Sequence, residues 1–209
     1  MLSASALLQL HDKLTAEWHT LPPAMDCGSV PVENEHQDAE TIFLAQVAQQ
    51  HRANFDLWHI EDEARTPGAT DAALADVKRR IDVTNQLRND RAENLDCLLL
   101  TWLAQRSLPN PAAALHSESP GLMIDRLSIQ ALKIYHTREE AERTGAPSGH
   151  AERNKDRLAT LEEQRADLAA CLDALWRESL AGAKRFKIYR QLKMYNDPSL
   201  NPSIYRKGM

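Results

Sequence analysis

Apolar residues recur along the chain at the spacing of an α-helix. In the first stretch they follow steps of three, four and four residues, at Leu7, Leu10, Leu14 and Trp18. The pattern predicts a helix from Ser3 to about His19. Leu21-Pro22-Pro23 ends it, because proline cannot continue a helix.

Four longer helices are predicted after a loop over residues 21–34, at about 37–65, 71–106, 120–143 and 150–183. Short turns rich in proline and glycine separate them, which favours antiparallel neighbours. We expect an all-α fold, an up-and-down bundle of four to five long helices with an N-terminal helix and a short C-terminal tail. Residues 1–35 would form the N-terminal helix and loop. Residues 36–209 would form the bundle with its basic tail, as a single domain overall.

The inward faces of three of these helices turn polar near their middles. Amide, carboxylate and guanidinium groups replace the apolar residues there, although asparagine and aspartate are poor helix formers. The candidate ligand-binding residues are Asn54, Trp58, His59, Asp62, Arg65, Asp82, Asn85, Arg88, Asn89, Asp125 and Arg126. Seven are expected to meet inside the bundle: Asn54, Asp62, Arg65, Asp82, Asn85, Arg88 and Asp125.

Two interpretations of this polar centre stay open. It is either a buried network that fixes helix register or a ligand cavity between helices. In the second case Arg65, Arg88 and Arg126 suit a phosphate or a sugar nucleotide, because guanidinium groups bind such anions in a bidentate way. Trp58 could stack on a sugar or a base.

No complete catalytic or metal-binding pattern is present in the sequence. The one Glu-x-x-His motif joins Glu33 and His36 in the predicted loop. His59 and Asp62 could chelate an ion, with Asp82 or Glu93 as further ligands, but the set is incomplete. We therefore predict no metal and no cofactor. Catalytic residues cannot be assigned, and whether the protein is an enzyme stays open.

Composition and charge restrict the class of protein. The net charge is −5, but residues 184–209 hold seven Lys and Arg against one Asp. This basic tail carries Phe186, Tyr189, Tyr195 and Tyr205, and we expect it to fold back onto the acidic body. A nucleic-acid partner is not favoured.

The cysteines and the apolar runs indicate the compartment. The three cysteines, Cys27, Cys97 and Cys171, are predicted to be buried free thiols, which fits a reducing cytoplasm. No apolar run is long enough to span a membrane. We expect a cytoplasmic protein.

Four blocks in order carry a resemblance to a known family. They are N-x-x-L-W-H-x-E-D-x-A-R (54–65), I-D-x-x-N-Q-x-R-N-D (81–90), I-D-R-L-S-I-x-A-L-K-I-Y-H (124–136) and F-K-x-Y-R-Q-x-K-M-Y-N-D-P-x-L-N-P (186–202). Over roughly residues 40–205 the chain resembles a bacterial family of unknown function, often encoded beside glycosyltransferases of surface-polysaccharide assembly. The resemblance implies an all-helical cytoplasmic protein and supplies no catalytic residues.

The resemblance favours an accessory or partner-binding protein of lipopolysaccharide-type assembly, with a glycosyltransferase or another protein as its partner. The alternative is an enzyme or binding protein for a phosphorylated small molecule or sugar nucleotide, a small anionic ligand held between the helices. Self-association stays open, because long helices can leave apolar seams.

Overall fold

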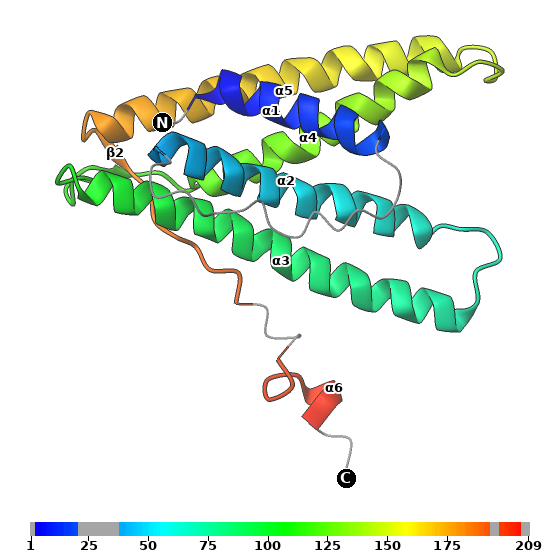
Figure 1. Ribbon diagram of the computed structural model, residues 1–209, viewed down its shortest axis with the longest axis horizontal. Coiled ribbons are helices and arrows are strands. Elements are labelled where there is room, and N and C mark those ends of the chain that lie inside the picture. Colours follow the sequence, from blue (N-terminus) through cyan, green and yellow to red (C-terminus); the bar gives the residue numbers. More distant parts are fainter. Residues whose placement is uncertain (1–2, 21–37, 193–196, 206–209) are drawn as a thin grey trace.

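The computed structural model (Figure 1) describes residues 3–20, 38–192 and 197–205. Its helices are α1 (Ala4–Thr20), α2 (Ala39–Glu63), α3 (Asp71–Ala104), α4 (Pro120–Glu142), α5 (His150–Leu180) and the short α6 (Pro202–Tyr205). The predicted all-α bundle is confirmed. The predicted boundary at residue 35, the Glu33–His36 pair, Cys27 and Tyr195 lie outside the described residues.

Side-chain caps explain where three of the long helices begin. Asp38, Thr70 and Ser119 have extended backbones immediately before α2, α3 and α4, and each side chain accepts a hydrogen bond from the first turn of its helix. Such caps satisfy backbone N–H groups that have no partner within the helix. Pro120 follows Ser119 at the start of α4, where a missing N–H costs nothing.

Helix α4 is the centre of the bundle and contacts α1, α2, α3 and α5. Helices α2 and α3 form one antiparallel hairpin, α4 and α5 form another, and α1 packs across both (Figure 1). The core includes Leu7 of α1, Phe43 of α2, Leu99 of α3, Leu127 of α4 and Leu172 of α5. Helix α1 is therefore part of the common core.

The start of α4 lies very close to α3. Asp96 of α3 accepts hydrogen bonds from the Ser119 hydroxyl and, at 2.7 Å, from the Gly121 N–H. A Cβ atom at Gly121 would lie 2.2 Å from the Ala92 carbonyl oxygen, so only glycine fits here. This contact fixes the height of α4 against α3, and with it the position of Asp125 one turn further along.

Two short strands attach the C-terminal segment to the bundle. β1 (Ala114–Leu115) pairs in parallel with β2 (Lys184–Arg185), and the following Phe186 is buried. The expected fold-back of the tail is confirmed for Phe186. Further along the tail, the Gln191 N–H donates to the Glu93 carboxylate of α3, so the segment also lies on the body there, although the side chain of Tyr189 is 42% exposed.

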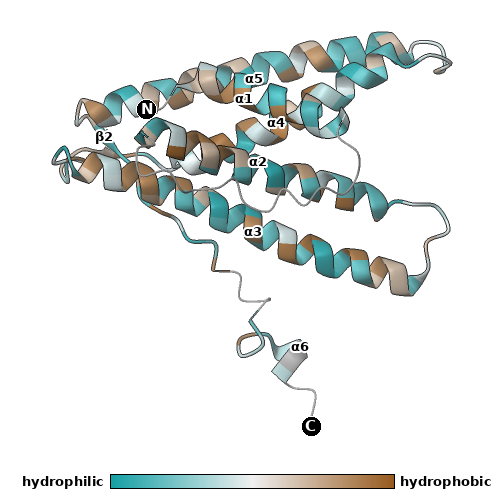
Figure 2. Cartoon of the chain, viewed as in Figure 1, coloured by the Kyte–Doolittle hydropathy of each residue, from teal (hydrophilic) through white to brown (hydrophobic). Residues whose placement is uncertain are grey.

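Hydropathy changes along α2. Figure 2 shows its hydrophobic residues mainly in the N-terminal half, whereas the C-terminal half is largely hydrophilic. In Figure 1 the α2–α3 turn and the α4–α5 turn lie apart at the same end of the molecule. The hairpins therefore diverge where the sequence turns polar, which leaves less of α2 covered.

The structure also tests the predicted burial of the cysteines and the predicted absence of a membrane-spanning helix. Cys97 and Cys171 are free, but both are exposed, so their predicted burial is wrong. Each is next to the residue that faces the core, Asp96 and Leu172 respectively, and is turned to the outside. Among the described helices, none combines the length and the apolar character needed to cross a membrane.

Candidate functional site

Asp125 of α4 is the acceptor at the centre of a buried hydrogen-bond network. Arg88 of α3 binds it in a bidentate way, with Nε 2.9 Å from Oδ1 and Nη2 2.7 Å from Oδ2. Gln50 and Asn54 of α2 donate to Oδ1 at 2.6 and 3.0 Å. Four donors from two helices therefore compensate the buried carboxylate, as a charge at 7% side-chain exposure requires.

The network continues from Asn54 toward α1. Asn54 Nδ2 also donates to the Ser128 hydroxyl oxygen at 2.9 Å, and Ser128 lies 2.7 Å from His51 Nδ1. His51 Nε2 lies 2.9 Å from the hydroxyl of Thr15, and that hydroxyl donates to the His11 carbonyl.

These contacts fix the tautomer of His51. Because the Thr15 proton is used on the His11 carbonyl, His51 Nε2 donates to Thr15, and His51 Nδ1 accepts from Ser128. Burial lowers the pKa of His51 to about 4, so the neutral ring that this arrangement needs is present at neutral pH. Ser128 is completely buried, so its hydroxyl is not accessible as a nucleophile. The chain of hydrogen bonds through Ser128 and His51 therefore has a structural role.

A cavity of about 350 Å³ lies on the solvent side of this network. Its polar lining consists of an amide, an indole, two carboxylates and two guanidinium groups, and three aliphatic side chains complete it. The lining residues are Asn54, Leu57, Trp58, Glu61, Asp62, Arg65, Arg88, Ile129 and Leu132. Five of the residues predicted from the sequence thus surround one space: Asn54, Trp58, Asp62, Arg65 and Arg88.

The predicted convergence inside the bundle is confirmed for Asn54, Arg88 and Asp125. It is wrong for Asp62 and Arg65, which are exposed at the rim of the cavity, where the hairpins diverge. The Arg65 side chain is 68% exposed and pairs with Glu61 on its own helix. An arginine with so few fixed contacts can turn toward a ligand.

The remaining predicted residues lie outside the cavity. Asp82 pairs with Lys78 along the exposed side of α3, so its predicted place in the network is wrong. Arg126 projects from another face of α4 and pairs with Glu118. Asn85 and Asn89 are half-buried on α3. Arg126 is one residue from Asp125, and that single step turns a helical side chain through about 100°.

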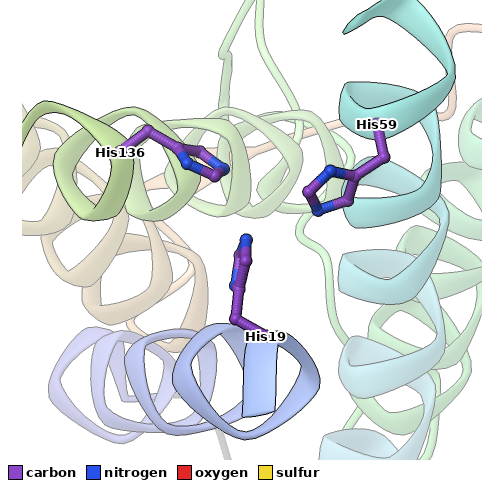
Figure 3. A group of neighbouring side chains, drawn as sticks. All are labelled: His19, His59 and His136. Atoms are coloured by element: carbon purple, nitrogen blue, oxygen red, sulfur yellow. The ribbon is translucent and has the colours of Figure 1, made fainter. Parts of the chain in front are cut away.

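A cluster of three histidines lies next to the cavity. His19 of α1, His59 of α2 and His136 of α4 point toward one another (Figure 3), and one ring nitrogen from each lies within 4.8 Å of the other two. The indole of Trp58 stacks on His136 with ring centroids 4.9 Å apart. Trp58 therefore contacts both the cluster and the cavity.

The sequence reasoning missed several residues of this region. Gln50, His51 and Ser128 complete the network, and His19 and His136 complete the cluster. Gln50 and Asn54 are one turn apart on α2, as Asp125 and Ser128 are on α4, so helical spacing could have indicated the network residues. For His19 no sequence signal exists, because its partners are 40 and 117 residues away. The two further ligands predicted for a chelate of His59 and Asp62 are engaged elsewhere, since Asp82 pairs with Lys78 and Glu93 accepts a hydrogen bond from the Gln191 backbone.

Comparison with known proteins identifies one family. The family described as "Protein of unknown function (DUF4254)" matches residues 44–188. The chain belongs to this family. The DUF4254 match includes the network residues of α2, α3 and α4, the cavity, His59 and His136, whereas α1 with Thr15 and His19 precedes it. No curated protein and no solved structure matches the chain.

Proposed function

We propose that the protein binds a phosphorylated sugar in the cavity between α2, α3 and α4. The observation that carries the proposal is the placement of the Trp58 indole, the Arg65 guanidinium and the Arg88 guanidinium around one space of about 350 Å³. Small-molecule sites typically have volumes of roughly 300–1,000 Å³. The space suits a sugar phosphate, or the glycosyl phosphate part of a sugar nucleotide whose base remains outside.

The donors and acceptors of the lining match such a ligand. Arg88 uses Nε and Nη2 on Asp125, and its Nη1 donates to no other described residue. Arg65 lies at the rim of the cavity and, among the described residues, forms an ion pair only with Glu61 of α2. The guanidinium groups of Arg65 and Arg88 can therefore approach a phosphate from two helices. Glu61, Asp62 and Asn54 offer acceptors for sugar hydroxyls, and Trp58 offers an aromatic face.

We further propose that this binding serves surface-polysaccharide assembly, with the protein as an accessory of a partner glycosyltransferase. The family resemblance of the four sequence blocks supports this role. Turnover of a sugar nucleotide by the purified protein alone would contradict it and would favour an enzyme.

The binding proposal is tested by calorimetric titration with UDP-glucose, glucose 1-phosphate, glucose and inorganic phosphate. We expect binding of glucose 1-phosphate and of UDP-glucose that exceeds binding of glucose or phosphate alone. Arg65→Ala should weaken this binding by roughly 10- to 100-fold, the loss of a charge-assisted hydrogen bond. Trp58→Ala should weaken it by a similar factor, because the stacking face is removed.

Arg126→Ala is the matched control, since Arg126 is an exposed, ion-paired arginine outside the cavity. It should bind the sugar phosphates as the wild type does. Equal affinity of the wild type, Arg65→Ala and Trp58→Ala for every ligand would contradict the proposal.

A further inference from the structure

We propose that His19, His59 and His136 form a binding site for a divalent transition-metal ion, with Zn²⁺ as the best match. The imidazoles come from three different helices and converge on one point between α1, α2 and α4 (Figure 3). The inference is independent of the sugar phosphate proposed above, because none of the three histidines lines the cavity.

Two ring nitrogens of the cluster are buried without a hydrogen-bond partner in the part of the chain that the structure describes. His19 Nε2 and His136 Nε2 are both buried and have no hydrogen-bond partner among the described residues. A buried polar atom without a partner is unfavourable and needs an explanation. Each of these two rings offers one nitrogen to the group that lies within 4.8 Å, and an ion bound there through the two Nε2 atoms would satisfy both.

The other nitrogens of these rings supply a second, independent argument. His19 Nδ1 lies 2.7 Å from the Thr15 carbonyl oxygen, and His136 Nδ1 lies 2.9 Å from the Glu139 carboxylate. Both oxygens accept a hydrogen bond, so each Nδ1 carries the proton and each Nε2 presents a lone pair. Metal-binding histidines are held in this way, with the second nitrogen donating to a carbonyl or carboxylate.

His59 completes the set from α2. It forms no hydrogen bond with any other described residue, and its ring contacts Phe55, His19 and His136. The carboxylate of Asp62 acts electrostatically on both rings and favours a cation between them.

The spacing of the nitrogens fits an ion after a small adjustment. Zn–N bonds of about 2.0–2.1 Å in a tetrahedron place the nitrogens roughly 3.3 Å apart. The nitrogens lie within 4.8 Å of one another, so rotation of the side chains brings them to this spacing while the helices stay in place. Three neutral imidazoles suit Zn²⁺ and its neighbours in the first transition row, and the fourth position is left to water or a ligand group.

The test uses the full-length protein, freed of metal with a chelator and titrated with ZnCl₂ in a calorimeter and with CoCl₂ in a spectrophotometer. We expect one equivalent of Zn²⁺ to bind and to raise the Tm. Bound Co²⁺ should show the intense visible bands of four-coordinate geometry. A sulfur-to-cobalt charge-transfer band should be absent, which excludes binding at the exposed Cys97 and Cys171.

Variants locate the site. His59→Ala should weaken Zn²⁺ binding by at least ~100-fold, since a primary ligand matters more than the outer partners, whose loss costs 10- to 100-fold. Glu139→Gln removes the carboxylate behind His136 and should weaken binding by that smaller factor, which identifies Glu139 as a positioning residue. His116→Ala is the matched control, because His116 is also half-buried but bonds to the Glu118 carbonyl outside the cluster.

Several results would overturn the proposal. The first is equal Zn²⁺ affinity in the wild type and His59→Ala. The second is the weak spectrum of six-coordinate Co²⁺ in the wild type. The third is that the wild type binds neither ion. Circular dichroism and the metal-free Tm show whether each variant is folded. His59 is only half-buried, so its replacement leaves the core intact even if His136→Ala does not fold.

Discussion

His51 of the buried network and the histidines of the neighbouring cluster differ in how their ring nitrogens are used. His51 bonds through both nitrogens, to Ser128 and to Thr15. His19 and His136 bond through Nδ1 only and leave a buried Nε2 without a described partner. We call the buried network that contains His51, with Asp125 at its centre, the closed network. We call His19, His59 and His136 the open cluster.

This difference distinguishes residues that stabilise the fold from residues that can bind a ligand. Every charge in the closed network has its partner inside the protein, so the network holds α1, α2, α3 and α4 in register. Only its edge, at Arg88 and Asn54, also lines the cavity. The open cluster and the adjacent cavity have donors and acceptors in excess. A comparable set of residue types therefore stabilises the fold at one level of the bundle and is available for binding at the next.

The largest expected effect comes from breaking the closed network at its charge. Asp125→Asn leaves Arg88 uncompensated and places an amide against the donors of Gln50 and Asn54. We expect the free energy of unfolding to fall by about 3 kcal/mol or more, measured by urea denaturation. Glu118→Gln, at the exposed pair with Arg126, should change it by less than about 1 kcal/mol. Equal losses in both variants would remove the distinction between buried and surface pairs.

Acid should act on the closed network through His51. Its pKa is about 4 in the folded protein and 6.5 in the unfolded chain, so the unfolded state binds more protons as the pH falls. Stability contributed by the neutral ring is present above pH 6.5 and is lost as the pH falls toward 4. Between pH 7.5 and 4.5 the wild type should lose about 2–3 kcal/mol more than His51→Gln does.

This comparison of two proteins at two pH values cancels the titrating groups that do not contact His51. The pKa of His11, which does contact it, is lowered mainly by burial in both proteins. Burial raises the pKa of Asp96 to about 6, which acts in the opposite direction because the folded state then takes up the proton first. Asp96 is present in both proteins and cancels. Identical pH dependence in the wild type and His51→Gln would contradict the assigned neutral tautomer.

Ser128→Ala removes one link of the closed network and keeps its charges. His51 Nδ1 and one Asn54 N–H would lose their partner inside the core. The expected loss of unfolding free energy is roughly 1–2 kcal/mol, measured by the shift of the urea midpoint at pH 7.5. Ser117→Ala, at an exposed position before α4, is the control and should be near neutral. A neutral Ser128→Ala would mean that these hydrogen bonds do not hold α4 to α2.

The smallest effect is expected in the open cluster. Without metal, His59→Ala removes no hydrogen bond to a described residue, so the free energy of unfolding should change by less than about 1 kcal/mol. With Zn²⁺ in excess the wild type should become more stable than this variant, since binding to the folded state adds stability. A large metal-free loss would place His59 with the packing residues and would weaken the contrast between the two groups.

Much of the fold could be predicted from the sequence, because its signals are local. Apolar spacing predicted the five long helices of the described residues. The side chains that cap α3 and α4, Thr70 and Ser119, are also next to their helices in the sequence. The candidate site could be predicted only in part. Asn54, Arg88 and Asp125 meet as expected, whereas Asp62 and Arg65 lie at the rim and Asp82 on the surface.

The sequence by itself determined the helices, their amphipathic faces and the polar middle of the stripes on α2, α3 and α4. These properties depend on residues three or four positions apart, and a helix brings such residues together without help from the rest of the chain. Only the tertiary structure decided which polar groups pair. His19, His59 and His136 come from three helices, and their approach depends on the crossing of α1 over the two hairpins and on the close contact of α4 with α3 at Gly121. No local pattern encodes those crossings, because they follow from packing the whole core at once.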